Sequence, residues 1–428
     1  MSKEYFDLPE GWSWQPLSAL AEIVSGGTPS REVAEYWDPA EIAWVTPTDI
    51  TGSDGRYLTS SKERISKAGL QKSSAAMLPV GTILMTSRAT LGQAKISAVE
   101  CCTNQGFKSL VPKTGVPPEY LYYLVQLFKN RYEQLGIGST FLEVSKKDTE
   151  KFMLPVAPEE QRSSIAKIID CVDNQIDATQ ALIDKYTAIK QGMMTDLFSR
   201  GIDPESKALR PTFEEAPELY HKTPLGMLPK GWDAYDIEDI SDVIDPNPSH
   251  RNPIYRADGF AFISTVEFIE GDSVETNTSR RVAESVVLEQ ERRCAFNENS
   301  IVFSRKGTIG ETRFVPTSCR FALLDSLCVL NPKNVDVTYF YHSLRSPSLK
   351  TQINQMVMGQ ALPQVSIGRV RELLIPMPND AMEQRLIGQR IGGIAELLNS
   401  ELLHLRKLQA QKSGLMQDLL TGKVPVPA

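Results

Sequence analysis

The chain has 428 residues, of which 41% are hydrophobic and 23% charged, and its formal net charge is −7. This length exceeds one ordinary hydrophobic core, so two to four structural units of a soluble globular protein are expected. No apolar run approaches the ~18 residues of a membrane span, and no signal peptide is recognisable, which predicts a cytoplasmic protein. The six cysteines lack metal-ligand spacing and predict reduced thiols and no metal site. The acidic balance disfavours a nonspecific nucleic-acid coat, which would be basic overall, but it is compatible with DNA binding through a local basic face.

The first motif is LPEGW at residues 8–12, and it returns as LPKGW at residues 228–232. Each copy predicts a turn with an aromatic anchor. A helix is predicted after the first copy, over residues 16–24. The turn-forming loop that follows, residues 25–30, lacks the lysine and the spacing of a nucleotide-binding loop.

Short strand-like runs alternate with turns over residues 41–111. The predicted strands are residues 42–45, 81–87, 93–99 and 108–111. Residues 54–113 hold nine Lys or Arg against three Asp or Glu, a local net charge of +6. Such a patch can bind phosphates, or it can be a solvated surface balanced by acidic neighbours, and charge alone leaves both open.

Residues 81–92 (GTILMTSRATLG) have a counterpart 218 positions later, residues 299–310 (NSIVFSRKGTIG). Both predict a strand followed by a polar, basic turn that contains glycine. Hydroxyl, guanidinium and backbone N–H groups at a strand end suit phosphate and base-edge contacts, although a hairpin with exposed charge would have the same pattern. The candidate phosphate or guanine contacts are Arg88, Arg305 and Lys306, with supporting hydroxyls from Ser87, Thr90, Ser304 and Thr308.

A helix with a core-facing stripe is predicted near residues 118–131. Two polar loops follow at equivalent places in the two halves of the chain, and we expect both to lie near a nucleic-acid groove. Their candidate residues are Gly138, Ser139 and Thr140 in the first half and Gly359 and Gln360 in the second. A Val-Ser pair then repeats at an offset of 221, as residues 144–145 and 365–366.

Two long amphipathic helices are predicted, over residues 158–201 and 380–422, and their apolar positions repeat every 3.5 residues in one shared register offset by 222. About 40 residues at 1.5 Å each would make each helix about 60 Å long. The predicted seam between the helices consists of Ile165, Ile169, Val172, Ile176, Ile183, Tyr186, Ile387, Ile391, Ile394, Leu398, Leu405 and Leu408. Two amphipathic helices that merely cover two cores are the alternative.

The ends of both helices carry start and stop signals. Glu159 and Glu160 suit the positive end of the first helix dipole, and Asp380 with Glu383 forms a predicted capping pair at the second. Glycines follow the last periodic residues of both helices.

The predicted fold class is mixed α+β, with two globular α/β domains separated by two long antiparallel coiled-coil helices and related by a pseudo-two-fold axis. The predicted segments are a first globular domain (residues 1–156), a first helix (157–201), a linker (202–226), a second globular domain (227–378) and a second helix (379–428). Two similar domains at a fixed separation would match a DNA target made of two short sequences with unread base pairs between them.

The chain resembles the specificity subunit of type I restriction–modification enzymes. The resemblance rests on both LP-x-GW motifs, on residues 81–92, on the Pro-x-x-Pro-x-Glu-Gln-Arg run over residues 155–162, and on the K-x-G-[LM]-M-x-D-L endings at residues 190–197 and 412–419. These motifs span essentially the whole chain. The second helix start departs from the first by two additional residues.

The resemblance implies a bipartite double-stranded DNA target, read by two recognition domains at a spacing that the helices set. It implies no catalysis by this chain. Two modification subunits would methylate adenine N6 with S-adenosylmethionine, and restriction subunits would translocate and cleave DNA with ATP and magnesium. The chain itself would bind no cofactor.

Three other functions stay open beside this one. The chain could belong to a related methylation-dependent defence assembly, or it could be a two-domain coiled-coil scaffold that binds protein or RNA. A self-contained methyltransferase or nuclease is disfavoured, because no [DNS]-P-P-[YF] motif, glycine-rich cofactor loop or GxxxxGK[ST] motif occurs.

Overall fold

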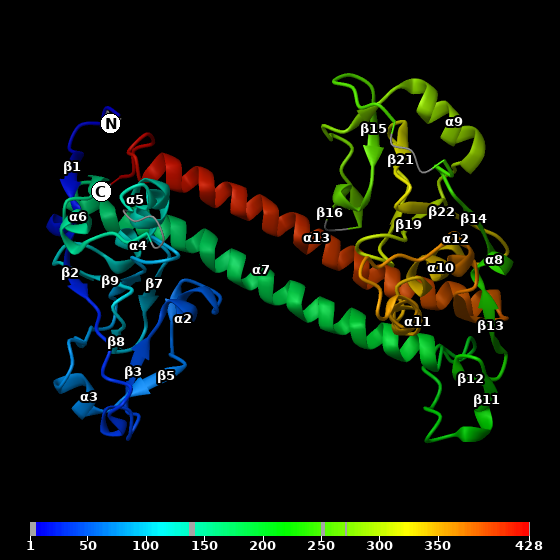
Figure 1. The fold of residues 1–428 in the computed structure, drawn as a ribbon, viewed down its shortest axis with the longest axis horizontal. Helices are drawn as coiled ribbons and strands as arrows, with labels where there is room; N and C mark the ends of the chain where they lie inside the picture. Colours follow the sequence, from blue (N-terminus) through cyan, green and yellow to red (C-terminus); the bar gives the residue numbers. More distant parts are fainter. Residues whose placement is uncertain (1–5, 137–141, 250–252, 270–271, 428) are drawn as a thin grey trace. The chain divides into compact units, whose positions relative to one another are not determined.

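The computed structural model describes residues 6–136, 142–249, 253–269 and 272–427. The chain forms two compact units, and both long helices contribute to both of them (Figure 1). Unit 1 consists of Met1–Ala178 with Arg406–Ala428, and unit 2 consists of Thr179–Leu405.

Unit 1 holds a five-stranded sheet in the order β2-β9-β6-β7-β4, a three-stranded sheet in the order β5-β3-β8, and the pair β1-β10. Its strands are β1 (Ser13–Pro16), β2 (Ala21–Ser25), β3 (Ile42–Val45), β4 (Tyr57–Leu58), β5 (Glu63–Ile65), β6 (Ile83–Met85), β7 (Ala94–Ser97), β8 (Cys101–Thr103), β9 (Lys108–Pro112) and β10 (Met153–Val156). Its short helices are α1 (Leu17–Leu20), η1 (Ala34–Tyr36), α2 (Pro47–Thr51), α3 (Lys67–Gln71), α4 (Pro118–Leu127), α5 (Lys129–Glu133) and α6 (Lys146–Glu150).

Unit 2 holds a four-stranded sheet in the order β14-β22-β19-β20, a three-stranded sheet in the order β18-β15-β21, and the pairs β13-β23, β11-β12 and β16-β17. Its strands are β11 (Tyr220–Thr223), β12 (Gly226–Pro229), β13 (Trp232–Asp236), β14 (Ser241–Ile244), β15 (Phe260–Ile263), β16 (Phe268–Ile269), β17 (Ser273–Val274), β18 (Arg281–Val282), β19 (Ile301–Ser304), β20 (Thr312–Phe314), β21 (Phe321–Leu323), β22 (Leu327–Pro332) and β23 (Leu374–Pro378). Its short helices are η2 (Pro217–Leu219), α8 (Ile237–Ile240), η3 (Thr265–Glu267), α9 (Glu284–Cys294), α10 (Val337–Ser343), α11 (Pro347–Val357) and α12 (Ile367–Arg371).

The two units share one strand plan. The order β2-β9-β6-β7 of unit 1 matches β14-β22-β19-β20 of unit 2, and in each case the neighbours are antiparallel. Each three-stranded sheet combines one antiparallel with one parallel pair, since β3 is parallel to β8 and β15 is parallel to β21. The duplication therefore extends through both globular parts, including segments in which the two sequences do not align by eye.

The helix predicted over residues 16–24 is wrong. Only α1 is helical there, and the chain continues as β2, in which Ile23 lies opposite Leu110 of β9. Pairing with β9 satisfies the backbone of β2, so tertiary structure overrides the local helical pattern. The predicted strand at 42–45 coincides with β3, those at 81–87 and 93–99 contain β6 and β7, and the one at 108–111 lies within β9.

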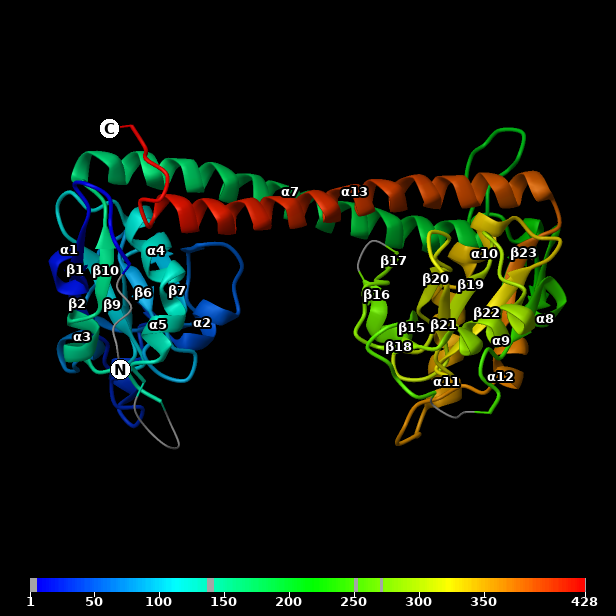
Figure 2. The same ribbon diagram turned by 90° about the horizontal axis from the view of Figure 1, so that it is seen from above.

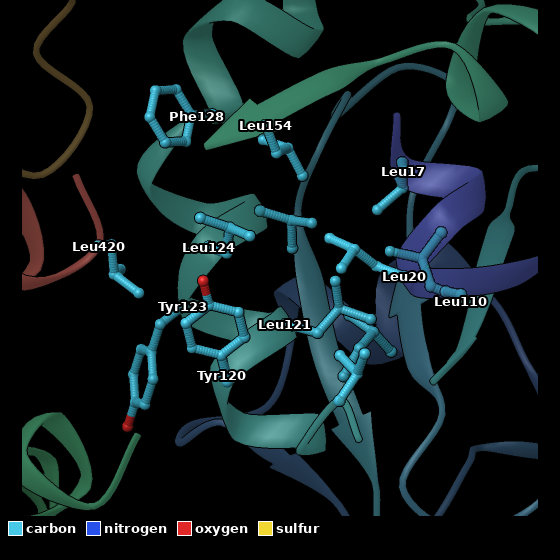
Figure 3. Packing of buried hydrophobic residues seen from close by; sticks show 14 of the residues in the cluster. Leu17, Leu20, Leu110, Tyr120, Leu121, Tyr123, Leu124, Phe128, Leu154 and Leu420 are labelled. Atoms are coloured by element: carbon cyan, nitrogen blue, oxygen red, sulfur yellow. The ribbon is translucent and has the colours of Figure 1, made fainter. Parts of the chain in front are cut away.

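The core of unit 1 packs the five-stranded sheet against α4 and both long helices (Figure 3). Leu121 and Leu124 of α4 are fully buried, and Leu420, which follows the second long helix, lies beside Tyr123 and Leu124 (Figure 3). The end of the second helix is therefore part of the core of the first unit.

The two long helices are α7 (Glu159–Ser199) and α13 (Ala381–Leu419). Each is followed by a glycine in the left-handed region, with φ +64° at Gly201 and +75° at Gly422. A Cβ atom at Gly201 would lie 2.5 Å from the Trp232 ring, and one at Gly422 would lie 2.9 Å from the Trp12 ring. Each LP-x-GW motif thus places its tryptophan against the end of a long helix, where only glycine fits.

All twelve seam residues are buried or partly buried. In unit 1, Ile165 and Ile169 of α7 share a core with Leu419 of α13, and the end of α13 lies beside the start of α7 (Figures 1 and 2). In unit 2, Leu197 near the end of α7 shares a core with Ile387 near the start of α13. The helices therefore run antiparallel in each unit.

A buried polar network joins the long helices to the globular part of unit 1. Lys412 Nζ of α13 lies 2.6 Å from Asp173 Oδ1 of α7. The Tyr123 hydroxyl of α4 lies 2.7 Å from both Asp170 and Asp173, and Arg56 contacts Asp170 at 3.1 Å. Burial, together with the two carboxylates, raises the pKa of Tyr123. These bonds fix the position of the domain along the helices.

A different network occupies the corresponding place in unit 2. Arg345 Nη1 donates to Asp272 Oδ1 at 2.7 Å, and the charge of Lys190 of α7 acts on the same carboxylate. Burial disfavours the charged form of Asp272. The positive charges of Arg345, Lys190 and Arg313 have the larger combined effect, so the pKa of Asp272 is lowered. His342, which stands where unit 1 has Tyr123, is buried, and this burial lowers its pKa to about 3.

The segment predicted as a linker, residues 202–226, is folded onto unit 2. Ile202 is fully buried, and its N–H donates to Glu383 Oε1 at 2.9 Å. Both Arg210 Nη1 and Nη2 donate to the Glu383 carboxylate, which also accepts from Trp232 Nε1 at 3.1 Å. Glu383 does not cap its own helix with Asp380 as predicted, because three distant donors bind it instead.

We expect Arg210→Met to destabilise unit 2 by about 3 kcal/mol, because it leaves the 2%-exposed Glu383 carboxylate buried without its cation. Urea unfolding followed by hydrogen exchange of unit 2 peptides measures this change. The exposed Lys222→Met is the matched control and should change the free energy of unfolding by less than about 0.5 kcal/mol. Adding Glu383→Gln should recover part of the loss, and an unchanged midpoint in Arg210→Met would contradict the assigned role.

Asp272→Asn should flatten the acid dependence of unit 2 unfolding. Because the folded pKa of Asp272 is lowered, its ionised form stabilises unit 2 above the unfolded pKa, and this contribution disappears as the pH falls. We expect the free energy of unfolding of the variant to be about 2 kcal/mol lower than that of the unchanged protein at pH 7, and this difference should become smaller between about pH 5 and 3. Hydrogen exchange of unit 2 peptides across this range is the measurement, and parallel pH profiles would refute the expectation.

Candidate nucleic-acid interface

The basic turn of unit 1 connects β6 to β7 and is closed by its own backbone and one hydroxyl. Thr86 N–H donates to Gln93 O at 2.8 Å, and Gly92 N–H donates to Thr86 O at 2.9 Å. The Thr86 hydroxyl donates to Thr90 O. Ala89 and Gly92 have positive φ, +57° and +71°, so the turn is tight.

The turn between β19 and β20 in unit 2 repeats these bonds. Ser304 N–H donates to Glu311 O and Gly310 N–H donates to Ser304 O, both at 2.9 Å. The Ser304 hydroxyl donates to Thr308 O at 2.5 Å. Gly307 and Gly310 carry the positive φ angles, +75° and +89°. The two turns are therefore equivalent at an offset of 218.

A second segment is tied to each turn by the same bond. Val144 N–H donates to Ser87 O at 3.1 Å, and Val365 N–H donates to Arg305 O at 2.8 Å. This equivalence places Arg305 at the position of Ser87, a buried position in both units.

The neighbouring position carries the accessible cation of each turn. Bridge pairing links Arg88 with Glu143 in unit 1 and Lys306 with Gln364 in unit 2. Arg88 and Lys306 are thus equivalent, and so are Glu143 and Gln364, which the sequence analysis did not single out. Their place directly before the repeated Val-Ser pair was the available signal.

In unit 1 one carboxylate balances two cations. Glu143 lies 2.9 Å from Arg88 and 3.7 Å from Lys108, whose Nζ donates to Ser87 Oγ at 3.3 Å. The Arg88 side chain is 44% exposed and that of Lys108 only 7%. Burial lowers the pKa of Lys108, whereas Glu143 raises it.

In unit 2 the buried cation is Arg305, which was predicted to contact phosphate or guanine. It is 5% exposed and pairs with Asp245 at 3.7 Å, while its Nε and Nη2 have no hydrogen-bond partner in the part of the chain that the structure describes. Lys306 is 33% exposed and lies 2.6 Å from Asp325. Lys306 is therefore the more accessible of the two candidates.

The buried cations of the two units come from strands that are not equivalent to each other. Lys108 begins β9 beside Ser87, whereas Arg305 follows β19 beside Cys328, the residue equivalent to Lys108. Burial raises the pKa of the Cys328 thiol to about 12, so the thiol stays neutral and adds no negative charge beside Arg305. Each turn thus keeps one cation beneath it.

The remaining candidates fall into three groups. The Ser87 and Ser304 hydroxyls are buried and bonded within their own units, whereas Thr90 and Thr308 are exposed on the turns. Gly138, Ser139 and Thr140 lie outside the described residues. Gly359 has φ +79° and Gln360 is exposed, but the Gln360 amide is bonded locally, donating to Met356 O at 2.9 Å and accepting from Gln364 N–H at 3.0 Å.

Unit 2 has an open cleft of about 1040 Å³ beside its turn. It is lined by Arg305, Lys306, Gln352, Gln355, Met356, Gln360, Gln364, Val365, Ser366 and Arg369. The lining combines cations with amides, the groups that contact phosphate oxygens and base edges.

The described residues contain no group of three or more His, Cys, Asp or Glu placed to hold a metal ion. Within the same residues, none of the helices is both long and apolar enough to cross a membrane.

The sequence model of the family described as "Type I restriction modification DNA specificity domain" matches residues 9–187 and 229–402. The chain is 25% identical over 426 residues to the type I restriction enzyme MjaIX specificity subunit of Methanocaldococcus jannaschii, across 98% of this chain and 95% of that protein. It is 24% identical over 185 residues to the EcoR124I/EcoR124II specificity subunit of Escherichia coli, across 42% of this chain and 45% of that one.

The fold is also similar to a solved structure, that of the type I restriction–modification system S subunit from M. genitalium. The match covers 100% of this chain and 99% of that chain, with a TM-score of 0.61 and 14% identity. The duplicated turns and strand plan lie in the two matched segments. The chain therefore belongs to the family of type I restriction–modification specificity subunits, which recognise the DNA target.

Proposed function

We propose that the chain reads a bipartite DNA target, with one half-site bound by each unit. The duplication of one basic turn carries this proposal, since the same backbone bonds present Arg88 in unit 1 and Lys306 in unit 2. Different side chains around an identical turn suit two different half-sites.

We propose that α7 and α13 set the distance between the half-sites. At 1.5 Å per residue, the 41 residues of α7 extend for about 60 Å, more than one turn of duplex DNA at about 34 Å. The buried ion pair between Lys412 and Asp173 supports a fixed helix register, because a slip of either helix would leave both charges unpaired.

The chain has no catalytic role in this proposal. It recruits two modification subunits, which methylate adenine N6 with S-adenosylmethionine, and restriction subunits, which use ATP and magnesium. The helices are the proposed docking elements. All cofactors belong to the partner subunits.

Exchange of residues 1–155 for the matching segment of a relative with another target tests the proposed function. The expected result is a complex that methylates a hybrid site, with one half-site changed and the other retained. Sequencing of methylated DNA from cells carrying the complete system reads both half-sites. An unchanged methylated sequence would refute the assignment of recognition to this segment, and methylation by the purified chain alone would refute its non-catalytic role.

Lys306→Met should weaken DNA binding by the complex through loss of one phosphate contact. The slope of log affinity against log salt concentration should then fall by about 0.9. Binding titrations at several salt concentrations measure the slope. Lys333→Met, which removes a half-exposed lysine paired with Asp242 elsewhere in unit 2, is the control and should keep the original slope.

A further inference from the structure

One position differs in chemistry between two otherwise equivalent turns. Glu143 and Gln364 pair with equivalent cations and precede equivalent valines, yet one is a carboxylate and the other an amide. In unit 1 the carboxylate is held by Arg88 and Lys108. Two recognition units that read different bases need differences at positions of this kind, where the backbone is fixed and the side chain varies.

The Gln364 side chain is presented to the cleft of unit 2. Its backbone N–H is held by Gln360, but its exposed amide has no hydrogen-bond partner among the residues that the structure describes. Gln352, another glutamine of the same cleft, is bonded at both ends of its amide to Leu374 N–H and O at 2.9 Å. Of the four glutamines that line the cleft, Gln352 and Gln360 are bonded within unit 2, whereas Gln355 and Gln364 are exposed and their amides have no hydrogen-bond partner among the described residues. Of these two, Gln364 is the one that pairs with the turn, at Lys306.

The cations of this cleft already have carboxylate partners. Lys306 lies 2.6 Å from Asp325, and Arg369 lies 3.2 Å from Glu372. Guanine is typically read by an arginine or lysine that can approach O6 and N7, whereas adenine is read by an amide that accepts from N6 and donates to N7. The available amide favours adenine.

Two large apolar side chains are exposed on the segment that precedes Gln364. Leu362 is 86% exposed and Met358 is 79% exposed, on the loop that carries Gly359. Large exposed apolar groups on a polar rim are informative about binding. In the major groove, the thymine C5-methyl group is the apolar contact that a base pair offers.

We propose that Gln364 reads adenine and that Leu362 contacts the thymine methyl group in an A·T segment of the half-site bound by unit 2. The two residues are separated by Pro363 alone, so they reach the same base pair or adjacent ones. This specificity rests on the proposed function, and it adds a contact that the shared turn does not determine.

Base analogues test the proposal in the complex with modification subunits, on the target found by methylation sequencing. Each thymine of the half-site bound by unit 2 is replaced by uracil, which lacks the methyl group, and each adenine by 7-deazaadenine, which lacks N7. At one position uracil should weaken binding about four-fold, the value of one buried methyl group. The adenine analogue should weaken binding at least five-fold.

The variants assign each contact to a residue. Leu362→Ala should abolish the uracil effect but keep the deazaadenine effect, and Gln364→Ala should do the reverse. Asn354→Ala, an exposed residue of α11 outside the cleft lining, should keep both effects. Because all three side chains are exposed, unchanged thermal unfolding should confirm that the variants are folded.

The outcomes separate this proposal from the proposed function. Sequence-specific binding without any analogue effect that depends on Gln364 or Leu362 would overturn the assigned contacts and leave DNA recognition intact. Binding of the complex with no sequence preference would overturn the proposed function itself.

Discussion

Both units depend on the hydrogen bonds and ion pairs of a buried carboxylate that one of the long helices supplies. In unit 1, Asp173 is bound by Lys412 from the second helix and by Tyr123 from the recognition domain. In unit 2, Glu383 is bound by Arg210 and Trp232. Burying such charges costs desolvation energy, so their net stabilisation is small, but a wrong register would leave them unpaired. They therefore contribute specificity of alignment, whereas the apolar seam contributes most of the stability.

The helices could be predicted from sequence because their periodicity is local. Positions from Ile165 to Leu408 follow the 3.5-residue repeat of packed helices, and the structure leaves none of the seam residues exposed. The helix predicted over residues 16–24 is wrong, and the packing of residues 202–226 on unit 2 could not be predicted, because both conformations depend on partners far along the chain. Strand β9 converts most of the first into a strand, and Glu383 anchors the second.

The candidate site, too, could be predicted from the sequence only in part. The turns could be predicted from their duplication, since hydroxyl, glycine and cation positions repeat at one offset. Which cation is accessible could not, because Arg305 is buried beside Asp245, a residue 60 positions away in the sequence. Glu143 and Gln364 were missed for a related reason: their role follows from bridge pairing with the turns, and pairing between distant segments leaves no periodic signal.

The hydrogen bonds that shape each turn explain how two copies could diverge in specificity without losing the fold. Most of them join backbone atoms, and the hydroxyl bond needs only Thr86 or Ser304. The Gln364 side chain makes none of these bonds, so its replacement leaves the backbone geometry of its turn in place, whereas Glu143 also balances Arg88 and the buried Lys108. One requirement limits this freedom. A cation must remain beneath the turn, and its move from β9 in unit 1 to the end of β19 in unit 2 shows that either strand can supply it. The scaffold thus constrains charge at the buried positions and leaves the exposed ones free to specify bases.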